Sequence, residues 1–421
     1  MQTNLTAEFR DTPDGRQAEA ILRKCVHCGF CNATCPTYQV LGDELDGPRG
    51  RIYLIKELLE GADVTRSTQL HLDRCLTCRS CETTCPSGVE YGRLVEIGRN
   101  LVEERVERPL KVRAVRWLLK EGLTSSLFAP AMRLGKMLRP ALPGLLRNKV
   151  PIRSGAPAAN MPARAHRRKV LLLGGCVQPA MMPNIHAATV RVLDAAGIQV
   201  LFAAGEGCCG ALRTHLSDRE GGLADMRRNV DAWWPLVAGG TIEAIVADAS
   251  GCSVMLKEYG HALREEPGYA NKAERIAALS MDLSEMLPEL VPALKDRIRA
   301  EGAGLAVHSP CTLQHGQQLR GLDAHLGALG FRTRVPIDSH LCCGSAGTFS
   351  VLEPELAYEL RGRKLRSLDA LEAQCIVSAN VGCIQHLQSG TRTPVRHWVE
   401  VLAQALVEEP GASRASIPET R

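Results

Sequence analysis

The chain carries the stretch CVHCGFCNATCP at residues 25–36, and a second copy, CLTCRSCETTCP, follows at residues 75–86. Both copies have the spacing C-x2-C-x2-C-x3-C-P. In bacterial proteins that hold two [4Fe–4S] clusters, the first three cysteines of such a run bind one cube and the fourth binds the other. We therefore predict two cubes. Their ligands are Cys25, Cys28, Cys31 and Cys85 for the first, and Cys75, Cys78, Cys81 and Cys35 for the second.

Zinc and disulfides are the competing uses of so many cysteines. Structural zinc sites usually take cysteines in pairs, not four at this spacing. Disulfides form in oxidising compartments, and Met1–Arg10 has neither the apolar run nor the cleavage pattern of a signal peptide. We therefore expect the 17 cysteines to act as thiolates in a reducing compartment, and a structural zinc scaffold ranks last.

Composition argues against several classes of function. The chain has 421 residues, 45% of them hydrophobic, so roughly two to four domains are expected. A net charge of +5 and only 4% aromatic residues argue against a nucleic-acid partner. No run of 18 apolar residues occurs, so we expect no membrane-spanning helix.

Residues 1–110 are expected to form an α-helical ferredoxin-type domain with two [4Fe–4S] clusters. Apolar residues at 52, 55, 58 and 59 fit one helix face, and a further helix is expected at 93–106. Arg49 and Arg51 begin the first of these helices. They lie either near the clusters or at a solvated helix start, and the sequence leaves both open.

Residues 111–166 are expected to form a helical linker. Between Phe128 and Leu142, basic residues at 133, 136 and 139 alternate with apolar ones. This amphipathic pattern is compatible with lying on a membrane surface, and also with a helix that covers its own domain or a neighbouring subunit. Ser154–Pro162, rich in alanine, proline and glycine, is expected to be a flexible connection.

The rest of the chain predicts two copies of one α/β unit, at 167–290 and 300–408, before a polar tail at 409–421. An apolar run at 170–173 ends in glycines, as a buried parallel strand does, and a helix at 187–196 and a strand at 198–202 follow. The cysteines then recur about 130 residues apart, each copy with a Cys-Cys-Gly string. The two sets are Cys176, Cys208, Cys209 and Cys252, and Cys311, Cys342, Cys343 and Cys383.

Each set supplies enough thiolates for a further cluster, and each also has the adjacent pair of a redox dithiol. The sequence leaves these alternatives open. Cys375 has no counterpart, and we expect it to be a buried structural thiol. Four histidines lie near these cysteines in the chain, and each is more often structural than a ligand. They are His215, His308, His315 and His386.

Longer stretches carry a resemblance to one family. They are CVHCGFC (25–31), LGDELDGPRGRIY (41–53), DAWWP (231–235), PCTLQH (310–315) and DSHLCCGSAGT (338–348). With the two cysteine runs and the two Cys-Cys-Gly units, they make nearly the whole chain resemble the iron–sulfur subunits of bacterial glycolate oxidase (glycolate dehydrogenase).

The resemblance implies a subunit of a three-subunit oxidoreductase. Two partner subunits carry FAD and oxidise glycolate to glyoxylate, and this subunit passes the electrons towards a quinone or another acceptor. The eight cysteines of the two runs match the family's cubane ligands. The resemblance also implies a location on the cytoplasmic face of the inner membrane. No G-x-G-x-x-G motif follows a strand, so we expect no catalytic residue in this chain.

Two other functions remain as alternatives. The first is the electron-transfer subunit of a complex that oxidises lactate or glycerol 3-phosphate. The second is a thiol enzyme like heterodisulfide reductase, whose repeats end in C-x2-C. Here Ala249 and Asn380 stand three residues before Cys252 and Cys383, so each repeat has four cysteines instead of five. That difference counts against the thiol enzyme and its noncubane cluster.

Overall fold

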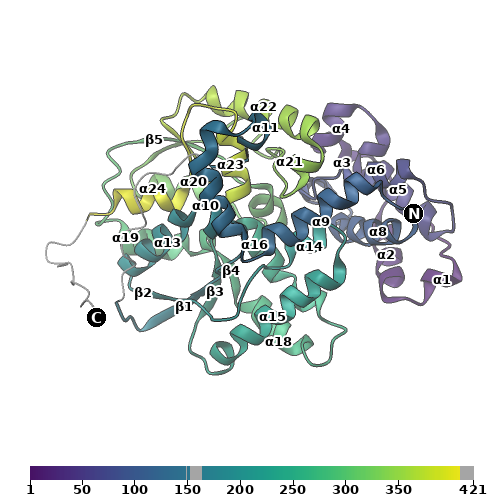
Figure 1. Cartoon of the computed structure of the whole chain (residues 1–421), viewed down its shortest axis with the longest axis horizontal. Helices are drawn as coiled ribbons and strands as arrows, with labels where there is room; N and C mark the ends of the chain where they lie inside the picture. Colours follow the sequence, from purple (N-terminus) through teal and green to yellow (C-terminus); the bar gives the residue numbers. More distant parts are fainter. Residues whose placement is uncertain (148, 152–163, 408–421) are drawn as a thin grey trace.

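The structure is a computed structural model that describes residues 1–147, 149–151 and 164–407. The connection expected at Ser154–Pro162 and the tail expected at 409–421 lie outside the described residues. Figure 1 shows a helical module at one end of the molecule and two sheet-containing units in the rest of it. Helices α9 and α10 run from the module across these units.

The helical module surrounds an apolar core between its longer helices. Its elements are α1 (Ala7–Arg10), α2 (Pro13–Lys24), α3 (Phe30–Ala33), α4 (Pro36–Leu41), η1 (Glu44–Asp46), α5 (Pro48–Leu59), α6 (Arg66–Asp73), α7 (Ser80–Thr84) and α8 (Tyr91–Arg105). The helix expected at 93–106 is confirmed as α8. The apolar face expected on α5 is confirmed as well, because Ile52, Ile55, Leu58 and Leu59 are all buried in this core.

Helices α9 (Leu110–Thr124) and α10 (Phe128–Leu138) join the module to the rest of the chain, and a turn η2 (Arg139–Ala141) and α11 (Gly144–Arg147) follow. Two side chains on them reach distant backbone. Arg116 donates to the carbonyl of Leu216, and Lys136 donates to the carbonyls of Ala180 and Met181. The amphipathic helix expected here therefore covers another part of the same chain along one face.

The two Cys-Cys-Gly units have the same sheet. The first has strands β1 (Arg168–Leu172), β2 (Ile198–Leu201), β3 (Ala244–Ala247) and β4 (Ser280–Asp282), in the order β2-β1-β3-β4. The second has β5 (Gly304–Val307), β6 (Arg332–Arg334), β7 (Cys375–Ser378) and β8 (Val395–His397), in the order β6-β5-β7-β8. All pairs are parallel. The expected fold class, a helical two-cluster domain followed by two repeated α/β domains, is confirmed.

Helices cover both sheets. Those of the first unit are α12 (Val177–Met181), α13 (Pro183–Ala195), α14 (Ala211–His215), α15 (Arg219–Ala238), α16 (Ser250–Lys257), α17 (Tyr259–Ala262), α18 (Ala270–Leu279), η3 (Leu283–Met286) and α19 (Leu287–Leu294). Those of the second are η4 (Thr312–Gly316), α20 (Leu322–Ala328), α21 (Phe349–Leu352), α22 (Pro354–Asp369), α23 (Val381–Gln388) and α24 (Trp398–Ala405).

The two units pack together through their helices. Helix α13 of the first unit packs on the last helix of the second, α24. Conversely, α20 of the second unit packs on α19 of the first. One apolar core therefore runs through both units and includes Val192, Leu290, Leu326 and Leu402.

The cysteines follow the carboxyl ends of the strands, where open parallel sheets place their ligand sites. Cys176 follows β1 and Cys252 lies in the first turn of α16, after β3. The loops of the two units meet at this edge, because the backbone N–H of Ser250 donates to the carbonyl of Ala379 at 3.0 Å. The sheet edges thus bring the cysteines of both units towards one region.

Candidate iron–sulfur sites

The two cysteine runs adopt the same backbone turn. His27 and Gly29 have φ angles of 60° and 84°, and the matching Thr77 and Arg79 have 51° and 58°. A left-handed conformation is uncommon outside glycine and costs roughly 1–3 kcal/mol per residue. Gly29 adopts this conformation freely, but His27, Thr77 and Arg79 do not, so the turn is a shared requirement of the loops that carry the sulfurs.

The first predicted set of ligands lines one cavity of about 30 Å³, near the module surface. Its sulfurs come from Cys25, Cys28, Cys31 and Cys85, and Cys81 reaches the same cavity. Burial raises the pKa of Cys31 to about 11, and the neighbouring cysteines Cys25, Cys85 and Cys28 add to the shift. Four thiols held this close need a cationic partner before they can all ionise.

The second predicted set lines a separate cavity of about 20 Å³. It is formed by Cys35, Cys75, Cys78 and Cys81. The structure thus brings together the cross-connected sets expected from the two runs, with the fourth cysteine of each run in the other run's cavity. Cys81 lies between the cavities and lines both. Neither cavity has a carboxylate among its lining residues, and this sulfur donor set fits iron–sulfur clusters.

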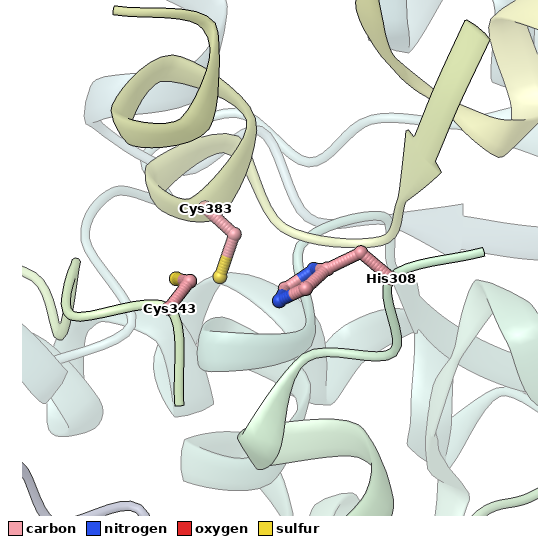
Figure 2. Close-up of side chains that lie close together, drawn as sticks. All are labelled: His308, Cys343 and Cys383. Carbon is pink, nitrogen blue, oxygen red and sulfur yellow. The ribbon is translucent and has the colours of Figure 1, made fainter. Parts of the chain in front are cut away.

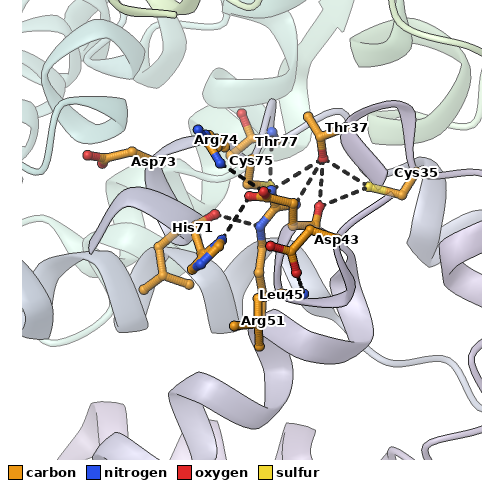
Figure 3. A network of polar contacts seen from close by, with 12 residues as sticks. Cys35, Thr37, Asp43, Leu45, Arg51, His71, Asp73, Arg74, Cys75 and Thr77 are labelled. Atoms are coloured by element: carbon orange, nitrogen blue, oxygen red, sulfur yellow. Dashed lines mark hydrogen bonds and ion pairs between the residues drawn. The ribbon is translucent and has the colours of Figure 1, made fainter. Parts of the chain in front are cut away.

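A buried polar network supports the second cavity (Figure 3). Arg51, which is 1% exposed, donates to the carbonyl of His71 at 2.7 Å and to Thr37 Oγ1 at 3.2 Å. The sulfur of Cys35 lies 3.2 Å from the same Thr37 hydroxyl. Asp46 accepts from Arg74 at 2.9 Å and lies 3.1 Å from Nδ1 of His71. The buried arginine therefore has a full set of partners next to a predicted ligand.

Arg51 also acts on Cys75. Burial alone would raise the pKa of Cys75, but the charges of Arg51 and Arg99 and hydrogen bonds from Thr77 and Tyr91 lower it overall. Of the two positions left open by the sequence, Arg51 thus lies beside a predicted ligand. Arg49 lies against Gly29, where a Cβ would meet its Nη1 at 2.8 Å, and lines the first cavity. Arg51 is buried beside a predicted ligand, whereas Arg49 lines the first cavity from the first turn of α5 with its side chain 36% exposed.

The cysteines of the first repeat face a much larger cavity, of about 800 Å³. All four, Cys176, Cys208, Cys209 and Cys252, line it. Hydrogen bonds from Cys176 and Cys209, and backbone N–H groups at the start of α14, lower the pKa of Cys208. A thiol that ionises this readily is a good metal ligand.

The second repeat packs directly against the helical module. Leu76 and Cys342 share an apolar cluster with Cys78 and Cys311. The sulfurs of Cys311 and Cys342 lie 3.9 Å apart. Burial raises the pKa of Cys78, and the nearby Cys311 raises it further. A predicted ligand of the second cube is therefore next to the cysteines of the second repeat.

The four histidines noted in the sequence have different surroundings. His215 lines the large cavity. His315 lies between Thr83 and the carbonyl of His340, and His386 stacks on Tyr358. Only His308 lies within 4.8 Å of two cysteine sulfurs, among the described residues. Cys375 is half-buried at the start of β7, and burial raises its pKa to about 11.

Sequence reasoning missed two groups at these sites. Asp46 was not predicted because its partner Arg74 is 28 residues away along the chain. Lys364 is buried, and its amine donates to the carbonyl of Asp338 at 2.9 Å, close to Cys342 and Cys343. A signal for it exists, because Leu360, Lys364 and Leu368 occupy one otherwise apolar face of α22.

None of the helices in the described part of the chain combines the length and apolarity that crossing a bilayer requires.

Comparisons with known proteins agree with this geometry. The model of a 4Fe-4S dicluster domain matches residues 21–89. The model of a cysteine-rich domain matches twice, at 170–257 and at 305–388. Each match of the second model covers three strands of one sheet and its Cys-Cys-Gly string, and ends before the fourth strand.

Two of the relatives extend over nearly the whole chain. The glycolate oxidase iron-sulfur subunit of Escherichia coli (strain K12) is 53% identical over 97% of this chain and 100% of its own length. The probable glycolate oxidase iron-sulfur subunit of Bacillus subtilis (strain 168) is 30% identical over 91% of each chain. Lactate utilization protein A of Bacillus licheniformis is 28% identical over 56% of this chain and 98% of its own. The chain belongs to the family of glycolate oxidase iron–sulfur subunits.

Proposed function

We propose that this chain is the electron-transfer subunit of a multisubunit glycolate oxidase. It takes electrons from FAD on partner subunits that convert glycolate to glyoxylate, and passes them towards a quinone or another acceptor. Substrate oxidation takes place outside this chain. The observation that carries the proposal is the pair of cysteine-lined cavities, the second of which adjoins the second repeat.

The ligands that we propose are the eight cysteines of the two runs, in the cross-connected sets described above. When bound, each cube takes up and releases one electron. The chain's own residues set the electrostatic environment of each cube. Arg51 and Arg99 place positive charge beside Cys75, and Cys35, Cys75 and Cys81 are buried at the second site.

The large cavity has room for more than one group. It is more than twenty times the volume of either cubane cavity, at about 800 Å³ against 30 and 20 Å³. We propose that the four cysteines of the first repeat hold a third cluster on its wall. Apolar residues of α9 and α10 line the cavity too, among them Leu119, Leu123, Phe128 and Met132. A lining of this kind and a volume of this size suit a small apolar electron acceptor such as a quinone.

The partner that donates electrons has a candidate docking face at the first cubane site. Cys28 is exposed there, and Val26 and Phe30, which flank it, are 68% and 61% exposed. Tyr53 adds a further exposed ring next to His27. Apolar side chains grouped on a surface in this way are typical of protein interfaces.

The outer faces of α9 and α10 support a peripheral contact with the membrane. Their exposed side chains are apolar or basic. The apolar ones are Leu110, Trp117, Leu118, Leu127, Leu134, Met137 and Leu138, and the basic ones are Lys111, Arg113 and Arg133. Amphipathic helices with this composition bind the interface of anionic bilayers. The same helices line the large cavity, so an apolar acceptor would have a short route into it.

The test is a comparison of Cys81→Ser with Cys375→Ser in anaerobically purified complex. The wild-type chain should contain at least about eight irons with matching sulfide, and glycolate should reduce it through the FAD subunits. Cys81→Ser should lose iron and glycolate-dependent reduction, whereas Cys375→Ser should keep both. A wild-type chain without iron would contradict the proposal. Reduction by lactate but not by glycolate would favour the lactate alternative. The similarity to lactate utilization protein A, at 28% identity, is the reason to test it.

A further inference from the structure

His308 lies beside two cysteines of the second repeat. The side chains of His308, Cys343 and Cys383 are all buried, and their ligand atoms lie within 4.8 Å of one another. Figure 2 shows the imidazole pointing towards the two thiols, which come from the Cys-Cys-Gly turn and from α23. We propose that the second repeat binds a single zinc ion through these three residues.

The spacing of the donor atoms favours one ion over a cube. Zinc–sulfur and zinc–nitrogen bonds of about 2.3 and 2.0 Å in a tetrahedron put neighbouring donors roughly 3.5–3.8 Å apart. The thiolates of a cube are held further apart, because each binds a different iron. In the described part of the chain, no three of the cubane cysteines have sulfurs within 4.8 Å of one another. Cysteine with histidine is also the donor combination that zinc prefers.

One other close group exists among the described residues, and it serves as a contrast. Asp43, Asp46 and His71 also lie within 4.8 Å. However, Asp46 already pairs with Arg51 and Arg74. These guanidinium groups take the place that a cation would occupy in that group.

The imidazole of His308 is oriented for binding. Its Nδ1 lies 3.0 Å from the hydroxyl of Ser378, which leaves Nε2 for the ion. Ligand histidines in zinc sites are commonly held through their other ring nitrogen in this way.

The first repeat lacks both members of this pair. The backbone N–H of His308 donates to Val377, and that of Leu173 donates to Val246, so Leu173 is the counterpart of His308. In the same register, Ala247 is the counterpart of Ser378. Histidine and the hydroxyl that orients it therefore occur together in one repeat and are absent together from the other.

The adjacent cysteines of the second repeat face different surroundings. Cys342 packs with Cys78 and Cys311 towards the helical module, whereas Cys343 packs with Cys383 in the core of the α/β units. The zinc site therefore needs only one of the two. Solvent completes the fourth position, and the buried amine of Lys364 lies near Cys343 and Cys383.

The test measures zinc, iron and sulfide in the full chain and records the zinc X-ray absorption edge. Wild type should bind zinc with sulfur and one imidazole as ligands. His308→Leu, which installs the residue of the first repeat, should lose most of the zinc and keep its iron. His386→Gln, which changes another buried histidine of the same repeat, should keep both metals. Iron content measures the cubes, and zinc content measures the proposed site. A failure of the proposed electron-transfer function would therefore appear in the iron and not in the zinc.

If misfolding makes His308→Leu lose iron as well as zinc, His308→Cys still tests the site. This variant should retain zinc, and the imidazole signal should disappear from its absorption spectrum. Wild-type chain that holds iron but no zinc, zinc retained in His308→Leu, or an imidazole signal that persists in His308→Cys would each overturn the proposal.

Discussion

The hydroxyl of Thr83 lies 2.9 Å from Nδ1 of His315, and this hydrogen bond joins α7 of the helical module to η4 of the second repeat. Nε2 of His315 lies 2.8 Å from the carbonyl of His340 and therefore donates to it. In the neutral ring Nδ1 then accepts from Thr83, whose single hydroxyl proton is shared with the carbonyl of Ser80 at 3.0 Å. One neutral imidazole thus links the second cysteine run to the loop that carries Cys311.

Thr83→Val should loosen this contact. Loss of one neutral hydrogen bond that leaves Nδ1 without a donor costs about 1–2 kcal/mol. Hydrogen exchange at α7 and η4 should therefore speed up, while iron content stays unchanged. Thr83→Ser keeps the hydroxyl and is the matched control. Equal exchange in the valine and serine variants would show that the bond contributes nothing to the docking of the module.

Arg51→Met should lower the reduction potential of the second cube. The variant removes a buried positive charge beside Cys75, and positive charge stabilises the reduced cluster. It also leaves Asp46 with fewer partners, at a cost of roughly 3 kcal/mol in the free energy of unfolding. A redox titration followed by EPR measures the shift, and the first cube is the internal reference. Arg51→Lys should restore most of the potential; a methionine variant with an unchanged potential would contradict the prediction.

His186 should make stability depend on pH. Its Nδ1 lies 2.7 Å from Asp248 Oδ2. Burial lowers the pKa of this imidazole, but Asp248 outweighs burial and raises it to about 9. An unfolded histidine has a pKa near 6.5, so the folded chain keeps a proton that the unfolded chain releases. The stabilisation is complete below about pH 6.5 and is lost as the pH rises through about 9, with a magnitude on the order of 3 kcal/mol.

Thermal unfolding from pH 6 to 9.5 measures this dependence. The wild type should lose more stability over that range than the double variant His186→Gln/Asp248→Asn, which replaces both charges. Parallel curves for the two proteins would mean that the pair does not hold the extra proton.

Gly344→Ala should destabilise the second repeat. Gly344 has a φ angle of 86°, and a Cβ there would lie 2.5 Å from the carbonyl oxygen of Ala357. Strain and clash together should cost more than about 2 kcal/mol. Gly347→Ala is the control, since its φ angle is 62° but its Cβ would meet nothing within 4 Å. It should cost about 1 kcal/mol. Chemical denaturation measures the free energy of unfolding of both variants. The difference between the two losses is the cost of the clash.

Leu134→Glu and Met137→Glu should weaken binding to membranes. Both residues lie on the exposed face of α10, and Met137 is 65% exposed. A carboxylate there removes apolar contact area and repels anionic lipid. Co-sedimentation with vesicles that contain anionic lipid measures the effect. Ile337→Glu changes an exposed apolar residue of the second repeat and should bind like wild type. Undiminished binding of both α10 variants would place the membrane contact elsewhere.

Local patterns in the sequence were enough to predict the elements and the two cysteine sets. The spacing of Cys25, Cys28 and Cys31 describes one loop, and the apolar face of α5 follows from a helical period. Such patterns report on neighbours along the chain. They could not show that Cys78 would meet Cys311, because this contact depends on how the helical module docks on the second repeat.

The same limit applies to His308. In sequence it was one of four histidines near cysteines, with nothing to distinguish it. Its position becomes special only when β5 and β7 pair, since that register places it beside Ser378 and near Cys383. The packing of α13 on α24 could not be predicted either, because an apolar helix face does not indicate which distant helix covers it.

This packing has a consequence for biosynthesis. Helix α24, at Trp398–Ala405, packs on α13 of the first repeat, whose own sheet is complete by Asp282. A ribosome therefore releases the whole first unit long before this packing partner exists. The helical module can fold and receive its metal early, but the face of α13 that meets α24 stays uncovered until the end of the chain is made. Assembly of this chain should depend on protection of that surface until translation ends.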